Sequence, residues 1–421
     1  MQKFIINGPV KLSGEIEVKG AKNQALKIIP ASILSKETIT IDNLPDVEDV
    51  KKSLALLEDL GAKISQKGSK VEINTSGINK IELNPEIADK FRASIMFIGP
   101  MLARFGEVKF PHPGGCVIGA GGRPIDVFIE GFKAMGVEIK EDGKSYHLKT
   151  KNGLKATNFF FKLVSVTATE TLMMAAALAK GTTKLHNCAM EPEIASLATY
   201  LNSQGANIKG AGTPSMEIRG VGEIKAGNFK IIPDRVETGS FAIMAAATGS
   251  EITIKKCQPD HIRILLEIFK RINIPFKETA DTLTIKKTKN IKPYNIKTHE
   301  YPGFPTDLQS PFTVLMTQAN GNSLIHETIY DRRLLFTDSL SQMGADITMC
   351  DPHRVVVNGP SRLYGRTLTS PDLRAGIALI IAAMTAEGRT EIDNIYQIDR
   401  GYEKIEARLN KLGAKIKRVD I

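Results

Sequence analysis

Six stretches of the chain are apolar on nearly every side. They lie at residues 25–34, 93–103, 168–179, 241–247, 311–319 and 375–386. A helix that is hydrophobic all round must be buried, so the pattern predicts six buried helices. Short segments of alternating apolar and polar residues follow, at 38–41, 183–186, 252–255, 323–326 and 390–393. Alternation with a period of two predicts strands with one face in water.

An amphipathic helix, a turn and another strand complete each repeat. The equivalent turn positions recur about every 70 residues, at Gly61, Gly136, Gly205, Asn273, Gly344 and Gly413. In the first repeat we expect Asp46 to be the N-cap of the amphipathic helix. The chain therefore reads as six copies of one supersecondary unit.

These repeats predict an α/β fold with helices inside and half-exposed sheets outside. Six copies can divide three and three between two domains, with a break near residues 230–235. One elongated repeat array is the alternative arrangement.

Composition and charge limit the kinds of partner that the protein is expected to bind. The 421 residues carry a net charge of +10, which favours anionic partners. There is no Trp, and aromatic residues do not interleave with Lys and Arg, so nucleic acid is not an expected partner. The longest apolar run, at residues 375–386, is too short to span a bilayer, and the N-terminus does not resemble a secretory signal. We therefore expect a cytoplasmic protein that does not bind membranes.

The four cysteines and seven histidines show no metal-binding spacing. Cys116, Cys188, Cys257 and Cys350 form no CxxC pair, and no HxxxH or HExxH motif is present. We therefore expect neither a disulfide framework nor a metal site.

A glycine-rich loop at residues 113–126 carries one thiol, Cys116. Pro124 suits the first position of a following helix, whose positive end would face the loop. Together with Arg123, that helix end would lower the pKa of the cysteine and make it reactive. The loop is therefore predicted to be a lid with a chemical role. An ordinary loop with a buried cysteine is the alternative.

Polar and charged residues stand where the buried helices begin. They are Lys22, Asn23, Arg92, Thr167, Thr169, Asp234, Arg235, Thr238, Thr306, Asp307, Asp372 and Arg374. If three such helices run parallel in each domain, their N-termini meet on one face. Two such faces opposed would form a cationic cleft suited to a polyanionic small molecule, and Arg333 and Arg400 could contribute to it.

Five segments resemble the signatures of the UDP-N-acetylglucosamine 1-carboxyvinyltransferase family. They are residues 22–26, 113–119, 123–126, 304–309 and 398–403. The resemblance covers essentially the whole chain and implies an inside-out α/β, barrel-like fold of two similar domains, each with three βαβαββ-type repeats. The first domain would comprise residues 22–232. The second would be discontinuous, with residues 1–21 and 233–421, and the active site would lie in the cleft between them.

The family's reaction moves the enolpyruvyl group of phosphoenolpyruvate to the 3′-hydroxyl of UDP-N-acetylglucosamine. Phosphate leaves after addition and elimination, in the first committed step of peptidoglycan synthesis. The resemblance therefore implies a role in cell wall biogenesis, cell shape and cell division. It implies no metal or organic cofactor, and we expect a monomer.

The resemblance also assigns roles to residues. Cys116 is the implied general acid and Asp307 the implied base, while Lys22, Arg123 and Arg400 would hold phosphoenolpyruvate. The remaining implied substrate-binding residues are Asn23, Arg92, Pro124, Ile125, Asp126, Val127, Leu163, Val164, Ser165, Val166, Ile329, Arg333, Asp372 and Arg374.

The chain departs from the family pattern at a few positions. The spacing between Gly119 and Arg123 is longer than usual, Leu163 stands where many members have Lys, and Arg332 is atypical. Three alternatives are therefore kept open. The first is the sister enzyme 5-enolpyruvylshikimate-3-phosphate synthase, which lacks the Pro-Gly-Gly-Cys loop. The second is a paralogue that binds UDP-sugar without turnover, and the third is a basic repeat protein that binds a polymer.

Overall fold

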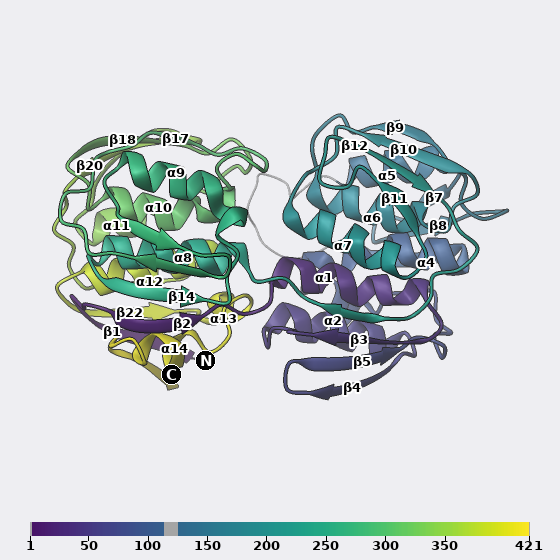
Figure 1. Ribbon diagram of the computed structural model, residues 1–421, viewed down its shortest axis with the longest axis horizontal. Coiled ribbons are helices and arrows are strands. Elements are labelled where there is room, and N and C mark those ends of the chain that lie inside the picture. Colours follow the sequence, from purple (N-terminus) through teal and green to yellow (C-terminus); the bar gives the residue numbers. More distant parts are fainter. Residues whose placement is uncertain (1, 113–124, 421) are drawn as a thin grey trace. The chain divides into compact units, whose positions relative to one another are not determined.

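A computed structural model describes residues 2–112 and 125–420. The chain divides into two compact units. The first unit contains residues 20–112 and 125–232, and the second contains residues 2–19 and 233–420 (Figure 1).

The first unit has three sheets among its described residues, with strand orders β13-β3-β5-β4, β11-β12-β10-β9 and β6-β8-β7. Its strands are β3 (Thr38–Asp42), β4 (Lys63–Lys67), β5 (Lys70–Asn74), β6 (Glu107–Pro111), β7 (Glu138–Glu141), β8 (Ser145–Lys149), β9 (Asn158–Phe160), β10 (Thr182–His186), β11 (Asn207–Lys209), β12 (Ser215–Arg219) and β13 (Asn228–Lys230). Its helices are α1 (Lys22–Ala31), η1 (Ser32–Leu34), α2 (Glu48–Asp59), α3 (Pro85–Ala88), η2 (Arg92–Phe97), α4 (Ile98–Phe105), α5 (Asp126–Ala134), α6 (Val166–Ala176) and α7 (Pro192–Ser203).

The second unit also has three sheets among its described residues, with orders β15-β16-β14-β2, β17-β18-β20-β19 and β21-β22-β1-β23. Its strands are β1 (Gln2–Gly8), β2 (Ser13–Glu17), β14 (Glu251–Lys255), β15 (Phe276–Glu278), β16 (Thr282–Ile285), β17 (Ile296–Lys297), β18 (Gly321–His326), β19 (Asp346–Asp351), β20 (Arg354–Gly359), β21 (Thr367–Thr369), β22 (Gly388–Asp393) and β23 (Ile416–Asp420). Its helices are α8 (Arg235–Ala247), η3 (Pro259–Ile262), α9 (Arg263–Arg271), η4 (Thr306–Leu308), α10 (Gln309–Met316), α11 (Thr337–Gln342), α12 (Leu373–Thr385), α13 (Tyr396–Asp399) and α14 (Ile405–Asn410).

The repeat is a βαβαββ unit. In the order β9, α6, β10, α7, β11, β12, the first two strands pair in parallel and the last two join the sheet antiparallel. In the second unit β2 supplies the parallel partner of β14, and β1 pairs with β22 and β23. The predicted fold class is therefore confirmed. The sheets of the described residues are separate and do not close into a barrel.

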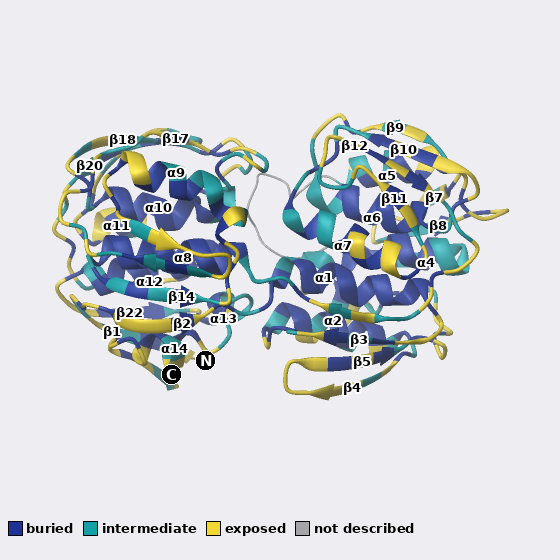
Figure 2. Ribbon diagram, in the orientation of Figure 1, coloured by how far each residue is buried: buried dark blue, intermediate teal, exposed yellow. Residues whose placement is uncertain are grey.

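The buried layer consists of the apolar helices, as the sequence predicts. All 13 residues of α8 are buried, and so is every residue of α10. Both helices pack together with α12 in the second unit, and strands such as β14 and β16 alternate between buried and partly exposed positions (Figure 2). The helices therefore form the core and the sheets form the shell.

Two local predictions are wrong. Asp46 does not cap α2, because Val47 is the extended residue before the helix and Asp46 instead forms an exposed ion pair with Lys51 at 3.2 Å. The helix after the glycine-rich loop begins at Asp126, later than the Pro124 position that the sequence suggested.

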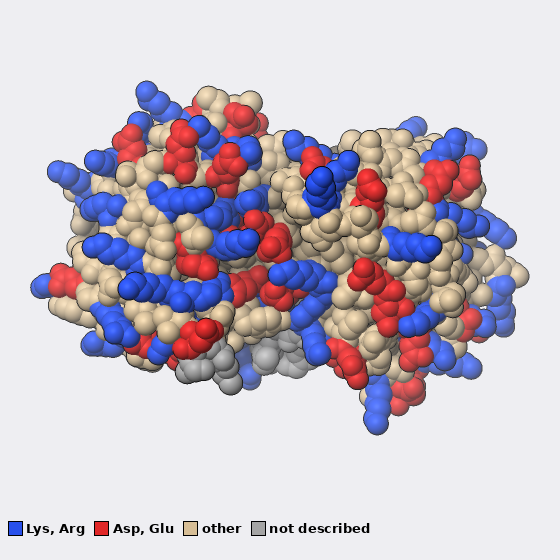
Figure 3. All heavy atoms as spheres, turned by 90° about the horizontal axis from the view of Figure 1, so that it is seen from below, with Lys and Arg blue, Asp and Glu red and all other residues tan. Residues whose placement is uncertain are grey.

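Charged side chains are dispersed over the face seen in Figure 3. Basic and acidic side chains are interspersed there. Exposed ion pairs of the second unit include Lys255–Glu15 and Lys256–Glu17. No helix among the described residues is both long enough and apolar enough to cross a membrane.

Candidate active site

A cluster of charged side chains in the second unit surrounds Asp307. This residue lies in η4, the short turn that leads into buried α10. Its Oδ1 is 3.1 Å from Nη2 of Arg333, and its Oδ2 is 2.8 Å from Nη2 of Arg374. Burial alone would raise the pKa of Asp307, but the charges of Arg374 and Arg333 hold that pKa well below its usual range. Asp307 is therefore ionised throughout the neutral pH range.

Three helix starts come together at this cluster. Asp234 accepts hydrogen bonds from two main-chain amides of α8, and Asp372 accepts two from α12, including that of Arg374 at 2.7 Å. The charge of Arg235, the first residue of α8, acts on Asp307, and that of Asp234 acts on Arg374. The structure thus brings together the polar residues that open α8, α10 and α12. Asp372 has a clear capping role within this arrangement.

Arg333 is only 4% exposed and stands on the segment after β18. Its guanidinium carbon lies 5.3 Å from the ring centre of Tyr330. Among the described residues, its Nε has no hydrogen-bond partner. A buried cationic donor of this kind suits an anionic ligand oxygen. The preceding residue, Arg332, has a left-handed backbone (φ 60°), which turns the chain before Arg333.

Ile329 lies on the same segment as Arg333, whereas Arg400 lies on another segment of the unit. Ile329 is half-buried in the turn after β18, and its amide donates to Oε1 of Glu327 at 2.9 Å. Arg400 directly follows α13, where its Nη1 donates to Gln397 at 3.0 Å.

In the first unit Lys22 and Asp49 form an ion pair. Lys22 opens α1 and Asp49 lies in the first turn of α2, with Nζ and Oδ2 3.0 Å apart. Both side chains are nearly buried, 11% and 5% exposed. Asn23 follows Lys22 in the first turn of α1, and Arg92 is the first residue of η2. Asp49 therefore orients a lysine that the sequence proposes for substrate binding.

The stretch before α6 presents both polar and apolar groups. Ser165 is the N-cap of α6 and accepts a hydrogen bond from the amide of Ala168 at 3.3 Å. Leu163 is 66% exposed, while Val164 and Val166 are partly buried. Ile125 precedes α5, which begins with Asp126 and Val127. These residues lie at the starts of two helices of the first unit.

Three of the predicted site residues, Cys116, Arg123 and Pro124, lie outside the described residues. The other cysteines have ordinary surroundings. Burial raises the pKa of Cys188 to about 12 and that of Cys257 to about 11, while Cys350 is exposed.

The structure adds two carboxylates that the sequence does not single out, Asp49 beside Lys22 in the first unit and Glu327 near Asp307 in the second. Arg235, which the sequence places at a helix start, acts on Asp307 through its charge. Asp49 and Glu327 gave no sequence signal, because a carboxylate in the first turn of a helix or after a strand is commonplace. Asp49 pairs with Lys22, which is distant in the chain, and Glu327 accepts hydrogen bonds from distant Thr306 and from Ile329 in the following turn.

The sequence model of the EPSP synthase family, 3-phosphoshikimate 1-carboxyvinyltransferase, matches residues 6–409. A UDP-N-acetylglucosamine 1-carboxyvinyltransferase from Desulforapulum autotrophicum is 43% identical over 419 residues, with both chains covered in full. A protein of the same name from Borrelia garinii subsp. bavariensis is 42% identical over 428 residues, covering 100% of this chain and 99% of the relative. The chain belongs to the UDP-N-acetylglucosamine 1-carboxyvinyltransferase family.

Solved structures share the family's fold. The enolpyruvyl transferase NikO from Streptomyces tendae superposes with a TM-score of 0.90 at 22% identity, covering 99% of each chain. EPSP synthase from Acinetobacter baumannii gives a TM-score of 0.75 at 17% identity, with both chains covered in full. At these identities the likeness establishes the fold alone.

Proposed function

We propose that the protein transfers the enolpyruvyl group of phosphoenolpyruvate to the 3′-hydroxyl of UDP-N-acetylglucosamine and releases phosphate. The observation that carries this proposal is the full-length similarity to relatives that bear this enzyme's name. In the cell, the reaction would be the first committed step of peptidoglycan synthesis. It would serve cell wall biogenesis, cell shape and cell division, and the enzyme would work in the cytoplasm.

In the proposed addition step, the sugar oxygen attacks the carbon of phosphoenolpyruvate that carries the phosphate ester. The thiol of Cys116 gives a proton to the methylene carbon, and Asp307 takes the proton of the sugar hydroxyl. Because two arginines hold the pKa of Asp307 low, this carboxylate is a weak base. It therefore orients the hydroxyl first and accepts the proton late, as the new carbon–oxygen bond forms.

Elimination reverses the proton transfer at carbon. The bond to the phosphate oxygen breaks, the methyl carbon returns a proton to the Cys116 thiolate, and the double bond is restored. The proton on Asp307 passes to the departing phosphate or to solvent. Lys22, Arg123 and Arg400 would stabilise the phosphate and carboxylate charges during both steps.

The proposal gives the other residues binding roles. Arg333 and Arg374 would supply cationic donors, and the buried Nε of Arg333 supports this role. The UDP-sugar would contact Ile125, Asp126 and Val127 at α5 and the segment from Leu163 to Val166 before α6. Asn23, Arg92, Ile329 and Asp372 would complete the site, and Pro124 would adjoin Arg123. That the two units share one site stays a prediction.

The test is phosphate release by the purified full-length protein. Phosphoenolpyruvate is supplied with UDP-N-acetylglucosamine in one arm and with shikimate 3-phosphate in the other. We expect phosphate only in the first arm, with one enolpyruvyl sugar formed per phosphate. Phosphate only in the second arm would favour EPSP synthase activity, the second candidate, which the family model's description supports. Tight binding of UDP-N-acetylglucosamine without turnover would indicate a non-catalytic paralogue.

A further inference from the structure

Glu327 is a buried carboxylate immediately after β18, with no exposed surface. A buried carboxylate is costly unless hydrogen-bond donors surround it. Four donors meet this one: the hydroxyls of Thr298 and Thr306 and the main-chain amides of Ile329 and Tyr330. Such a set of contacts fixes the side chain in one position.

The two carboxylate oxygens reach different parts of the second unit. Oε2 accepts from the Thr306 hydroxyl at 2.8 Å, and Thr306 opens η4 directly before Asp307. Oε1 accepts from the amides of Ile329 at 2.9 Å and Tyr330 at 3.1 Å, in the turn that leads to Arg333. One side chain therefore ties the segment of Asp307 to the segment of Ile329.

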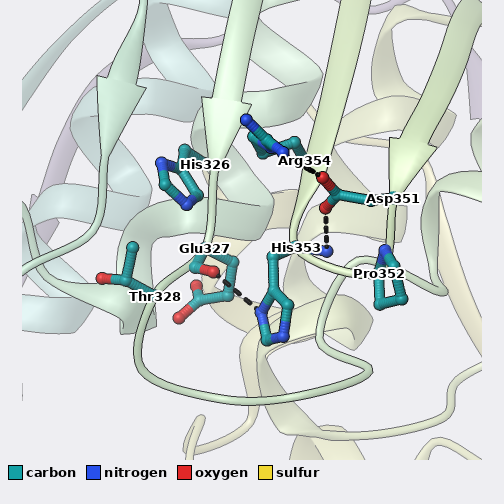
Figure 4. Close-up of a pocket in the computed structure, with 7 residues that line it drawn as sticks. All are labelled: His326, Glu327, Thr328, Asp351, Pro352, His353 and Arg354. Carbon is teal, nitrogen blue, oxygen red and sulfur yellow. Dashed lines mark hydrogen bonds and ion pairs between the residues drawn. The ribbon is translucent and has the colours of Figure 1, made fainter.

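The main chain of Glu327 is held from the opposite side. Its amide donates to the carbonyl of His353 at 2.8 Å, and its carbonyl oxygen lies 3.1 Å from Nδ1 of that histidine. Figure 4 shows this contact in the wall of a pocket formed by the end of β18 and the turn between β19 and β20. Nε2 of His353 is 3.3 Å from Asp331. The residue is thus anchored to the sheet while its carboxylate reaches the site segments.

Thr298 adds a further anchor to this arrangement. It follows β17, which runs parallel to β18, and its Oγ1 donates to Oε1 of Glu327 at 3.1 Å. The amide of Thr328 donates to the same hydroxyl at 2.8 Å. The ends of two adjacent parallel strands are therefore tied together at Glu327.

We propose that Glu327 is a positioning residue that sets the distance between Asp307 and Ile329 and so the binding of the sugar acceptor. This inference rests on the proposed function. It follows from three of the four hydrogen bonds, because their donors, Thr306, Ile329 and Tyr330, are residues assigned to the acceptor or the direct neighbours of such residues. A carboxylate that only stabilised the fold would need no such connection to both segments.

The experiment compares Glu327→Ala with Glu327→Gln. Alanine removes all four contacts, whereas the glutamine amide oxygen keeps the Oε1 contacts and its NH2 group can donate to the Thr306 hydroxyl. For Glu327→Ala we expect the KM for UDP-N-acetylglucosamine to rise and kcat to fall, lowering kcat/KM roughly 10- to 100-fold. The KM for phosphoenolpyruvate should stay within about twofold, and Glu327→Gln should restore kcat/KM to within about threefold of wild type.

Leu283→Ala is the control for general destabilisation, because Leu283 is fully buried in β16 and belongs to a different sheet. It should lower Tm without changing either KM. Thr306→Val removes only the hydrogen bond between Glu327 and η4, and it should change the acceptor KM in the same direction as Glu327→Ala. It therefore keeps the inference testable if Glu327→Ala fails to fold.

Two results would overturn the inference while leaving the proposed function intact. One is an unchanged acceptor KM in both Glu327→Ala and Thr306→Val, and the other is the same change in Leu283→Ala. Calorimetric titration of wild type with UDP-N-acetylglucosamine shows whether the proposed function itself fails. A wild-type protein that neither binds nor converts this sugar would overturn the proposed function and this inference together.

Discussion

Asp307 and Arg374 form an ion pair although 67 residues separate them in the chain, with Oδ2 and Nη2 2.8 Å apart. Asp307 stands before α10 and Arg374 in the first turn of α12, and the two helices pack against each other in the core. The packing of two apolar helices thus places a carboxylate beside a guanidinium. Arg333 completes the contact from a third segment.

Breaking the ion pair between Asp307 and Arg374 should lower the stability of the protein. Arg374→Gln leaves the Asp307 carboxylate paired with Arg333 alone, so we expect the free energy of unfolding to fall by about 1–3 kcal/mol. Arg354→Gln is the matched control, since Arg354 forms an exposed pair with Asp351 and should contribute less than about 1 kcal/mol. Urea unfolding at pH 7 measures the loss in both variants, and equal losses would contradict a special role for the partly buried Asp307–Arg374 pair.

The same variant should change the pH dependence. The pKa of Asp307 is lowered on folding, so its contribution is complete above the unfolded pKa, about 4, and is lost as pH falls through the folded value. Arg374→Gln raises the folded pKa. The destabilisation caused by the substitution should therefore shrink on acidification below about pH 4. Unfolding curves at pH 3.5, 4.5 and 7 test this, and a pH-independent difference would argue against it.

Asp49 should matter through Lys22. Asp49→Asn removes the charge that holds the Lys22 ammonium, so we expect the KM for phosphoenolpyruvate to rise about tenfold, with a smaller change for the sugar. Glu48→Gln is the control, because Glu48 is the neighbour of Asp49 in α2 and pairs with Lys51 on the surface. Initial rates of phosphate release give both constants. A similar effect of the two substitutions would contradict the idea that Asp49 positions Lys22 for phosphoenolpyruvate.

Cys116 should be the cysteine that an epoxide alkylates. Fosfomycin, the family's epoxide inhibitor, is expected to add once per chain and to leave Cys188 and Cys257 unmodified, because burial raises their pKa values to about 12 and about 11. Intact-protein and peptide mass spectra of wild type, Cys116→Ser and Cys350→Ser locate the adduct. An adduct that persists in Cys116→Ser would contradict the prediction. Cys116→Ser should also lose most phosphate release, since a hydroxyl is a far weaker acid than a thiol.

Glu170 should make the first unit less stable at alkaline pH. Burial raises its pKa to about 8, against the opposing charge of Lys27 at 3.3 Å. Because the folded pKa lies above the unfolded value, its contribution is complete below about pH 4.5 and is lost as pH rises to about 8. Each pKa unit corresponds to about 1.4 kcal/mol, so the loss is on the order of a few kcal/mol. Glu170→Gln should flatten the dependence of unfolding free energy on pH between 5.5 and 8.5, and an unchanged slope would contradict this.

The helices could be predicted because their composition leaves one physical option. An α8 or α12 that is apolar on every side has no solvent-compatible face, so burial follows from the residues alone. Alternating segments such as residues 252–255 likewise specify half-exposed strands. The cap of α2 could not be read in the same way. The N-cap position of α2 is occupied by Val47, whose main chain is extended, although the side chain of Asp46 is the better capping group.

The sequence by itself determined the six repeats, the buried helices, the outer strands and the polar residues that open the helices, because local periodicity specifies which surfaces leave water. It also carried the motifs of the family. Only the tertiary structure decided that Arg374 and Arg333 flank Asp307, that Asp49 holds Lys22 and that Glu327 joins two segments of the site. These contacts depend on which helices and strands become neighbours, and residues far apart in a chain have no local pattern that records their distance in space.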